Sequence, residues 1–579
     1  MRRLTALMLL LVASGGVSFG FEAIASTPEV GWPSPVIPVT VSLATDTGES
    51  KSGAIVLRAA DFTMRYPVDM PPNTTREILL PVPRQFSDYT LSFEGGGLPM
   101  QIAAPAPFWG EDVVLATVGD SPGMINVLID EGDPEQMGPR TQVVHWGLGQ
   151  VPPQSAILKD VEAIFLGDGS DRLRDHEVRA LRDYVLLGGN VVIPSGAAAL
   201  VARDLRWADW LPATVGDPIT VPATEVGLAG TNVRSVTIRQ LTPVEGAVQL
   251  RPHVYRRAHG LGTVTLLAAD VFETDLRTDA KAAALFRSVG NRPMGIEFRG
   301  DPLFDHQTGE SETFRVRPPG VWQIFGWLLA YIFIVGPLNF LVLSKLNRKE
   351  LAWFTAPLLS VVFAGIVVSQ SQVRRTSGAA REANVKMVAD PATGRALVLG
   401  QQLLFFPDGG THDLKMKGVT SIWFNRRRDD NPWQSLAGNR GIFADGVTFG
   451  TEFDFTRMQA KSLAYEQFSF LQETERSVGI DATATRTAPG EYVVTAVNKG
   501  AEPITNVAIT LNGFTPVGRL DKDLAPGERV RVPVKVPESN GVRRNGLILT
   551  GDVDGAAGAQ VGNGDVRIEY QTLVLVGGA

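Results

Sequence analysis

Four polar residues that follow predicted strands are the strongest candidates for a binding site in this sequence. Asp120 closes the run DVVLATVGD, Asp168 and Ser170 follow VEAIFL, and Ser195 follows NVVIP. Open α/β sheets bind ligands at the carboxyl ends of their parallel strands, so we expect these side chains to border one crevice. Carboxylates there could hold a hard cation such as Ca²⁺ or Mg²⁺. Solvated loop acids and helix caps explain the same residues more simply, and no metal ligand is assigned.

Ser195 is also the candidate nucleophile, in the turn Ile193-Pro194-Ser195-Gly196. A catalytic serine needs a base and an oxyanion hole. Ser195 does not lie in a G-x-S-x-G pattern, and the downstream His253 and His259 lie in RPHVYRRAHG, which is typical of a strand and a turn. A hydrolase that uses Ser195 is therefore the alternative function, and a hydrogen bond within a βα turn is the simpler role.

Composition excludes several classes of site. The chain of 579 residues has no cysteine, which rules out disulfides, thiolate metal ligands and a thiol nucleophile. The six histidines show no H-x-x-H or H-E-x-x-H spacing, so zinc is disfavoured. A net charge of −7 without a long basic run gives no support for nucleic-acid binding. We expect no cofactor.

The candidate crevice needs a parallel sheet to position it, and residues 108–318 have the matching pattern. Apolar runs alternate with a helical segment, DHEVRALRDYVLLGG. In that segment Asp175 suits an N-cap, Val178, Leu181 and Val185 share one face, and the Gly pair ends the helix. Strand, helix and strand in this order predict right-handed crossovers and a doubly wound parallel sheet.

This region resembles the class I glutamine-amidotransferase-like, flavodoxin-like domains of bacterial membrane proteins. The resemblance rests on VEAIFLGDGSDRLRDHEVRALRDYVLLGGNVVIPSG and GLGTVTLLAADVFETDL and covers residues 110–295. Active members of that family place a cysteine in a tight turn after a strand. Ser195 lies in the similar turn here, so the resemblance implies the fold without amidotransferase chemistry.

The remaining exported segments read as β-sandwiches. Short alternating strands separated by turn clusters predict a β-sandwich over 26–107 and a β-rich domain over 373–475. Residues 476–579 resemble bacterial immunoglobulin-like spacer modules, through NKG and LAPGE turns between alternating strands. Such modules bind or space, and seldom catalyse.

Two uncharged runs predict a transmembrane hairpin over 319–372, with spans at 321–343 and 351–369. Residues 1–25 are typical of a signal peptide, with a small-x-small cleavage site before Ser26. Lys345, Arg348 and Lys349 make the loop between the spans positive, but arginines also flank the other ends. The signal peptide therefore decides the orientation: we expect the loop in the cytoplasm and both large portions in the periplasm.

These observations favour a non-enzymatic protein of the cell envelope, anchored in the inner membrane bilayer. Its expected role is that of a scaffold or interaction subunit with envelope protein partners. The family resemblance implies association with an AAA+ ATPase system. Besides the Ser195 hydrolase, the alternative is an envelope sensor whose ligand or cation occupies the crevice of Asp120, Asp168, Ser170 and Ser195.

Overall fold

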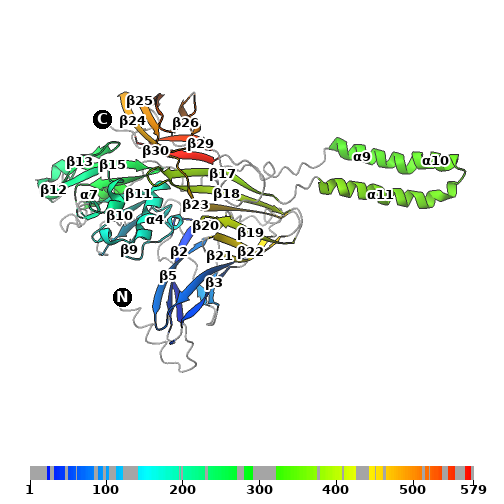
Figure 1. Cartoon of the computed structure of the whole chain (residues 1–579), viewed down its shortest axis with the longest axis horizontal. Coiled ribbons are helices and arrows are strands. Elements are labelled where there is room, and N and C mark those ends of the chain that lie inside the picture. Colours follow the sequence, from blue (N-terminus) through cyan, green and yellow to red (C-terminus); the bar gives the residue numbers. More distant parts are fainter. Residues whose placement is uncertain are drawn as a thin grey trace, which may run out of the picture.

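The structure is a computed structural model of the chain. It describes residues 22–26, 32–45, 48, 50–59, 62–83, 89–94, 100–102, 113–120, 141–194, 196, 200–228, 233–269, 280–290, 321–373, 379–406, 410–424, 442–449, 452–460, 464–511, 515–520, 522–536, 546–553 and 568–575. These residues form a mixed α/β and β-rich protein with several sheets and two long apolar helices (Figure 1). At that level the predicted fold class is confirmed.

A seven-stranded sheet lies in the first half of the chain. Its order is β14 (Val248–Arg251), β15 (Val254–His259), β16 (Gly262–Leu267), β11 (Asn190–Ile193), β10 (Ala163–Leu166), β8 (Val113–Val118) and β9 (Thr141–Trp146). The five strands from β16 to β9 are parallel, whereas β15 and β14 run antiparallel at one edge. Every residue of β10 and β11 is buried, as expected of strands covered on both faces.

Helices cover this sheet. α4 (Asp175–Leu186) joins β10 to β11, and α7 (Ala280–Gly290) follows β16. A buried polar network ties α7 to the sheet: the Asn190 amide donates to the carbonyls of Val289 and Gly290, and Arg256 donates to Val289. The short helices are α3 (Ser155–Leu158), η2 (Ser170–Arg172), α6 (Leu205–Ala208) and η3 (Ala223–Val226), and β12 (Ala213–Pro222) pairs with β13 (Ser235–Pro243).

The start of α4 differs from the predicted cap. Arg174 occupies the N-cap position and Asp175 is the first helical residue. The carboxylate of Glu177 accepts the backbone N–H of Arg174 at 2.9 Å, as the acidic side chain of a capping box does. Glu177 is fully buried, and its carboxylate needs hydrogen-bond donors. The helix therefore begins where the backbone N–H of Arg174 can supply one, and not with Asp175 as the N-cap.

Strands from both sides of the predicted hairpin share one sheet. Its order is β19 (Gly410–Lys417), β22 (Glu452–Ala460), β21 (Ile442–Phe449), β4 (Phe62–Met70), β3 (Lys51–Ala59), β6 (Tyr89–Phe93) and β7 (Met100–Ile102). β21 and β4 are parallel neighbours. A three-stranded sheet, β1 (Glu22–Ser26), β2 (Val36–Ala44) and β5 (Thr75–Pro83), adjoins them.

The C-terminal half builds an eight-stranded sheet. Its order is β20 (Val419–Phe424), β23 (Ala464–Glu475), β18 (Arg395–Phe406), β17 (Ala379–Asp390), β30 (Ile568–Val574), β29 (Leu547–Val553), β26 (Thr505–Leu511) and β27 (Thr515–Arg519). A separate sheet contains β24 (Ile480–Ala488), β25 (Glu491–Asn498) and β28 (Arg529–Lys535). The last strand, β30, pairs in parallel with β17, so the end of the chain extends the sheet that begins after the hairpin.

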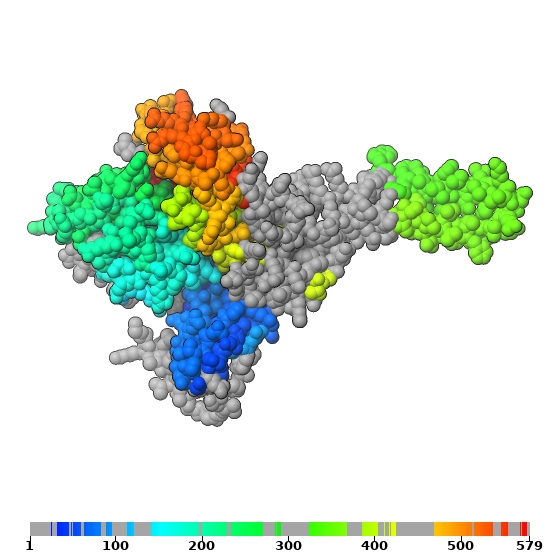
Figure 2. Space-filling model, viewed as in Figure 1, coloured from blue at the N-terminus to red at the C-terminus, as the bar shows by residue number. Residues whose placement is uncertain are grey.

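Two long helical segments project from the sheets as a hairpin (Figures 1 and 2). The first runs through α9 (Val321–Phe333), η4 (Ile334–Leu338) and α10 (Asn339–Lys345), and the second through η5 (Lys349–Leu351) and α11 (Ala352–Val373). Both are long and apolar enough to cross a membrane. Pro337 lies in η4, a π-helical turn, which fits the loss of one backbone donor inside a helix.

The predicted domain boundaries remain predictions. The strand pairing adds that the segments 26–107 and 373–475 contribute to one sheet, and that 373–475 and 476–579 contribute to another. Residues 1–21 lie outside the described residues, so the predicted signal peptide is visible only at its end. There Glu22–Ser26 form β1, which pairs with β2.

Candidate functional site

Three of the four residues predicted to border the crevice, Asp120, Asp168 and Ser170, lie at one edge of the parallel sheet. Asp120 follows β8, whereas Asp168 and Ser170 follow β10, and the two strands are neighbours. The backbone N–H of Asp120 donates to the carbonyl of Asp168 at 3.0 Å. In chain order the parallel strands run 2-1-3-4-5, so the connections diverge between β8 and β10. Such a switch point is where open α/β sheets bind ligands.

Asp120, one of the two acids at this edge of the sheet, is in a salt bridge. The Arg172 guanidinium bonds the carboxylate of Asp120, and both side chains are about half exposed. Gly169, next to this pair, has a φ of +81°, a backbone conformation that favours glycine. A Cβ atom at this position would lie 2.6 Å from an oxygen of the Asp120 carboxylate, which is too close. The turn therefore needs glycine to hold this pair.

The other predicted residues of the crevice give mixed results. Ser170 is buried, and within the described part of the chain its hydroxyl has no hydrogen-bond partner. Asp168 is exposed. Ser195 lies outside the described residues. Among those that are described, no group of three or more His, Asp or Glu side chains is arranged to hold a metal ion.

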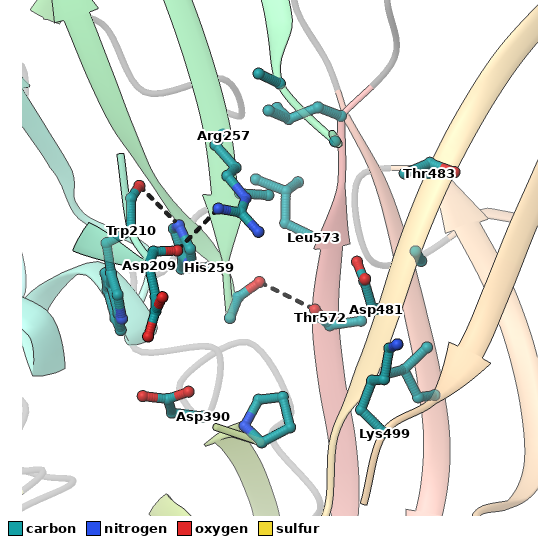
Figure 3. Close-up of a pocket in the computed structure, with 18 of the residues that line it drawn as sticks. Asp209, Trp210, Arg257, His259, Asp390, Asp481, Thr483, Lys499, Thr572 and Leu573 are labelled. Atoms are coloured by element: carbon teal, nitrogen blue, oxygen red, sulfur yellow. Dashed lines mark hydrogen bonds between the residues drawn. The ribbon is translucent and has the colours of Figure 1, made fainter. Parts of the chain in front are cut away.

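A larger hollow lies where the α/β sheet meets the C-terminal sheets. Its volume is about 720 Å³, within the range of small-ligand and peptide sites. One wall comes from the loop after α6 and from β14–β15, the opposite wall from β24, and β30 lies between them (Figure 3). We call this hollow the interdomain groove. Leu573 of β30 donates its backbone N–H to the carbonyl of Gly260 at 2.7 Å, which joins its floor to the α/β sheet.

Three side chains stack on the α/β side of the groove, and two of them, Trp210 and His259, line it. The ring centroids of Trp210 and His259 lie 4.3 Å apart, with an angle of 9° between the ring planes. The guanidinium of Arg182, on α4, lies 4.4 Å from the centroid of the Trp210 ring. Nε2 of His259 contacts the Trp210 carbonyl at 3.0 Å, and because a carbonyl only accepts, Nε2 carries the proton. Burial, together with the positive charge of Arg257, lowers the pKa of His259 to about 3. The imidazole is therefore neutral, and its donor is already used.

The opposite wall carries charges without partners. Asp481 of β24 and Lys499 after β25 line the groove from the side of the sheet that contains β24 and β25 (Figure 3). Among the described residues, neither side chain has a hydrogen bond or ion pair. Across the groove, Arg257 donates to the backbone carbonyl of Asp209 at 2.8 Å rather than to a carboxylate. The groove thus offers charges of both signs to a ligand.

A cluster of partly buried ion pairs joins α4 to the C-terminal sheet beside the groove. Arg395 of β18 bonds both oxygens of the Asp183 carboxylate on α4, at 2.6 and 2.8 Å, and also the carboxylate of Glu473. Arg182 bonds Asp390 at 2.9 Å at the end of β17. Burial opposes the charge of Arg395, but the two carboxylates raise its pKa above its ordinary value. These pairs fix the orientation of α4 on the C-terminal sheet.

No local sequence pattern points to the groove. The pattern around His259 offers that residue only as a base for Ser195, and no motif singles out Asp390, Asp481 or Lys499. The lining residues come from seven separate runs of the chain, and no local spacing links them. Asp390 ends β17 and Asp481 lies near the start of β24, but acidic residues are common at strand ends and do not by themselves indicate a site.

Comparisons with known proteins leave the family open. No protein-family model matches the sequence, and no curated protein matches it. Among solved structures, it is similar to an exo-β-1,4-mannosidase from an Opitutaceae bacterium, with 16% identity over 30% of this chain and a TM-score of 0.18. The chain spans 35% of the length of that mannosidase.

A second similar structure is the yeast delta-COP-I mu-homology domain complexed with a WxWxV peptide, with 7% identity over 34% of this chain, 92% of that domain and a TM-score of 0.16. TM-scores this low carry no argument about fold or function. They give no support to the amidotransferase-like resemblance, which remains a prediction.

Proposed function

We propose that this protein is an envelope protein anchored in the inner membrane by the hairpin of α9, α10 and α11, whose periplasmic body is a non-enzymatic interaction subunit. The parallel pairing of β21 with β4 carries the proposal. Strands that share hydrogen bonds lie in one compartment. The chain before the hairpin and the chain after it are therefore on the same side of any membrane that the hairpin enters.

The surface of the hairpin supports the membrane anchor. Large apolar side chains are exposed around both helices, among them Leu328, Ile332, Phe354, Leu358 and Val361. An apolar surface of this extent needs a partner or a lipid environment. The segment from Phe325 to Lys345 has 21 residues, enough for about 30 Å of hydrocarbon. The loop with Lys345, Arg348 and Lys349 favours the cytoplasm.

The arrangement of the sheets supports an interaction role over catalysis. The 2-1-3-4-5 order is that of flavodoxin-like domains, and it agrees with the proposed amidotransferase-like fold without its cysteine. The strands after residue 480 agree with an immunoglobulin-like spacer. His259, the histidine nearest to a catalytic assignment, stacks on Trp210 and uses its one N–H on a carbonyl. Burial lowers its pKa to about 3, which makes its ring a poor base for a serine hydroxyl.

Purification of the tagged full chain from membranes in a mild detergent tests the interaction role. We expect a second protein to co-purify in a fixed ratio to the chain, as measured by native mass spectrometry. A matched membrane protein with the same tag controls for adventitious capture. Recovery of the chain as a clean monomer from membranes that are crosslinked before extraction would contradict the proposal.

A further inference from the structure

The edge of β24 that faces the interdomain groove has free backbone hydrogen-bonding groups. β24 is the outer strand of its sheet, next to β25. The N–H of Lys499 donates to the carbonyl of Gly479 at 2.8 Å, so the next pair, Ile480 and Asn498, is a non-hydrogen-bonded pair of the ladder. The N–H of Ile480 instead points outward and donates to Tyr570 at 3.0 Å.

The same alternation fixes the direction of the following residues. The register between β24 and β25 is regular from Ile480 to Arg486. Ala482 and Ala484 therefore also direct their N–H and C=O groups away from β25. Both residues line the groove, and among the described residues no partner takes these groups. An unpaired edge of this kind is a template for another strand.

We propose that the groove binds an extended peptide segment of a partner protein, which pairs with β24 at Ala482 and Ala484. The proposal rests on the interaction role proposed above and names its site. The lined part of β24, 480–484, is long enough for roughly four residues of an extended peptide at about 3.3 Å each. Backbone pairing supplies affinity, and side-chain contacts supply specificity.

Charge complementarity defines the segment. Asp481 and Lys499 present unpaired charges of opposite sign on one wall, and Asp209 and Arg257 line the other. A peptide with an acidic and a basic side chain satisfies both signs while its backbone pairs with β24. A sugar chain lacks the regular donors and acceptors of a strand, and the rings of Trp210 and Tyr570 are buried and offer it no stacking face.

Site-specific crosslinking of the full chain in its native membrane tests the proposal. p-Benzoylphenylalanine in place of Thr483, which lines the groove, is photoactivated and the adduct is identified by mass spectrometry. We expect a peptide of a second protein. Ala482→Pro removes the outward N–H while leaving the pairing with β25 intact, because proline is tolerated on strand edges. It should lower the adduct yield about tenfold, equivalent to about 1.4 kcal/mol, the order of one lost hydrogen bond.

Ala482→Val is the matched control, because it keeps the N–H and should keep the adduct. Equal melting temperatures of the two variants exclude misfolding as the cause. An adduct with another segment of this chain, with a glycan, or with nothing overturns the peptide proposal. If a partner still co-purifies in a fixed ratio with Ala482→Pro and the adduct is unchanged, the interaction role stands and the groove assignment fails. If neither partner nor adduct is found, both fail.

Discussion

His259 shows how one side chain depends on its neighbours for its charge. The ring stacks on Trp210, Arg182 lies over the Trp210 ring, and Arg257 lines the groove with Asp209 and Asp390. A proton on His259 would meet two cations in a half-buried site. The neutral ring is therefore part of the folded wall of the groove.

This environment predicts a pH dependence. The pKa of His259 is about 3 in the folded protein and near 6.5 in the unfolded chain, so between these values the unfolded chain binds the extra proton. Stability that is present above pH 6.5 is lost as the pH falls, by up to about 1.4 kcal/mol per pH unit. Hydrogen exchange of peptides containing Trp210 and His259 should show the loss of protection, and His259→Phe should reduce it.

The control for this prediction is His176→Phe, since His176 is exposed on α4. It should leave the acid-dependent exchange of the groove wall unchanged. The same slope in wild type and His259→Phe would show that His259 does not carry the pH dependence.

At this scale the sequence showed the residues of the crevice but not those of the groove. Asp120, Asp168 and Ser170 follow strands whose apolar runs are local, so their meeting follows from the order of a parallel sheet. Arg172, which bonds Asp120, was not anticipated because its direction depends on the turn at Gly169. Asp481 and Arg257 line one groove only through the packing of separate sheets, which no local pattern encodes.

At the scale of elements, α4 and β18 form the joint between the α/β sheet and the C-terminal sheet. The joint is ionic: Arg395 of β18 bonds Asp183 of α4 and Glu473 of β23, and all three side chains are largely shielded from water. The helix itself was predictable from its apolar period and its glycine stop. The strand on which the helix packs was not predictable, because Asp183 lies on α4 and its partner Arg395 lies more than two hundred residues later in the chain.

Breaking this joint should be costly. Arg395→Met leaves two carboxylates without their cation, one of them with a side chain only 9% exposed, and we expect a loss of about 3–5 kcal/mol. Urea unfolding in detergent, followed by hydrogen exchange in α4, measures it. Lys535→Met is the control, because the Lys535–Glu491 pair is 85% and 46% exposed and worth less than about 1 kcal/mol. Equal losses in both variants would contradict the role of the joint.

At the scale of the whole molecule, the hairpin interrupts a body that its two flanks build together. Besides β21 and β4, a contact near the N-terminus joins the units: Trp32 donates from its indole N–H to the carbonyl of Ile157 in α3, at 3.0 Å. Ser421 of β20 donates to the Gln154 side chain at 3.2 Å. The two apolar spans and most strands follow from local patterns, but the pairing of strands so distant in sequence does not.

A disulfide across the shared sheet tests this arrangement, and the cysteine-free chain makes the test clean. Arg65 and Thr448 are register partners in β4 and β21. Arg65→Cys with Thr448→Cys should form a disulfide in the exported protein. After cleavage at a protease site inserted between α10 and α11, the halves should stay joined on non-reducing gels and separate on reduction.

Arg65→Cys with Lys522→Cys is the control pair, since Lys522 is exposed in the C-terminal half and lies in neither strand of the pair. If only the control pair links, or if neither pair does in a chain shown to be exported, β4 and β21 do not share an edge.

The pairing of β4 with β21 also has a consequence for biogenesis. The ribosome completes β4 several hundred residues before β21, and both helices of the hairpin are made in between. At about 5–20 residues per second, the edge of β4 stays open for on the order of tens of seconds. During that time it is a site for wrong pairing, so a chaperone must shield it or the chain must stay extended. The hairpin is therefore made before the sheet of β4 and β21 can be completed. With the hairpin as the proposed membrane anchor, we expect a defect in its insertion to appear as misfolding of the N-terminal half.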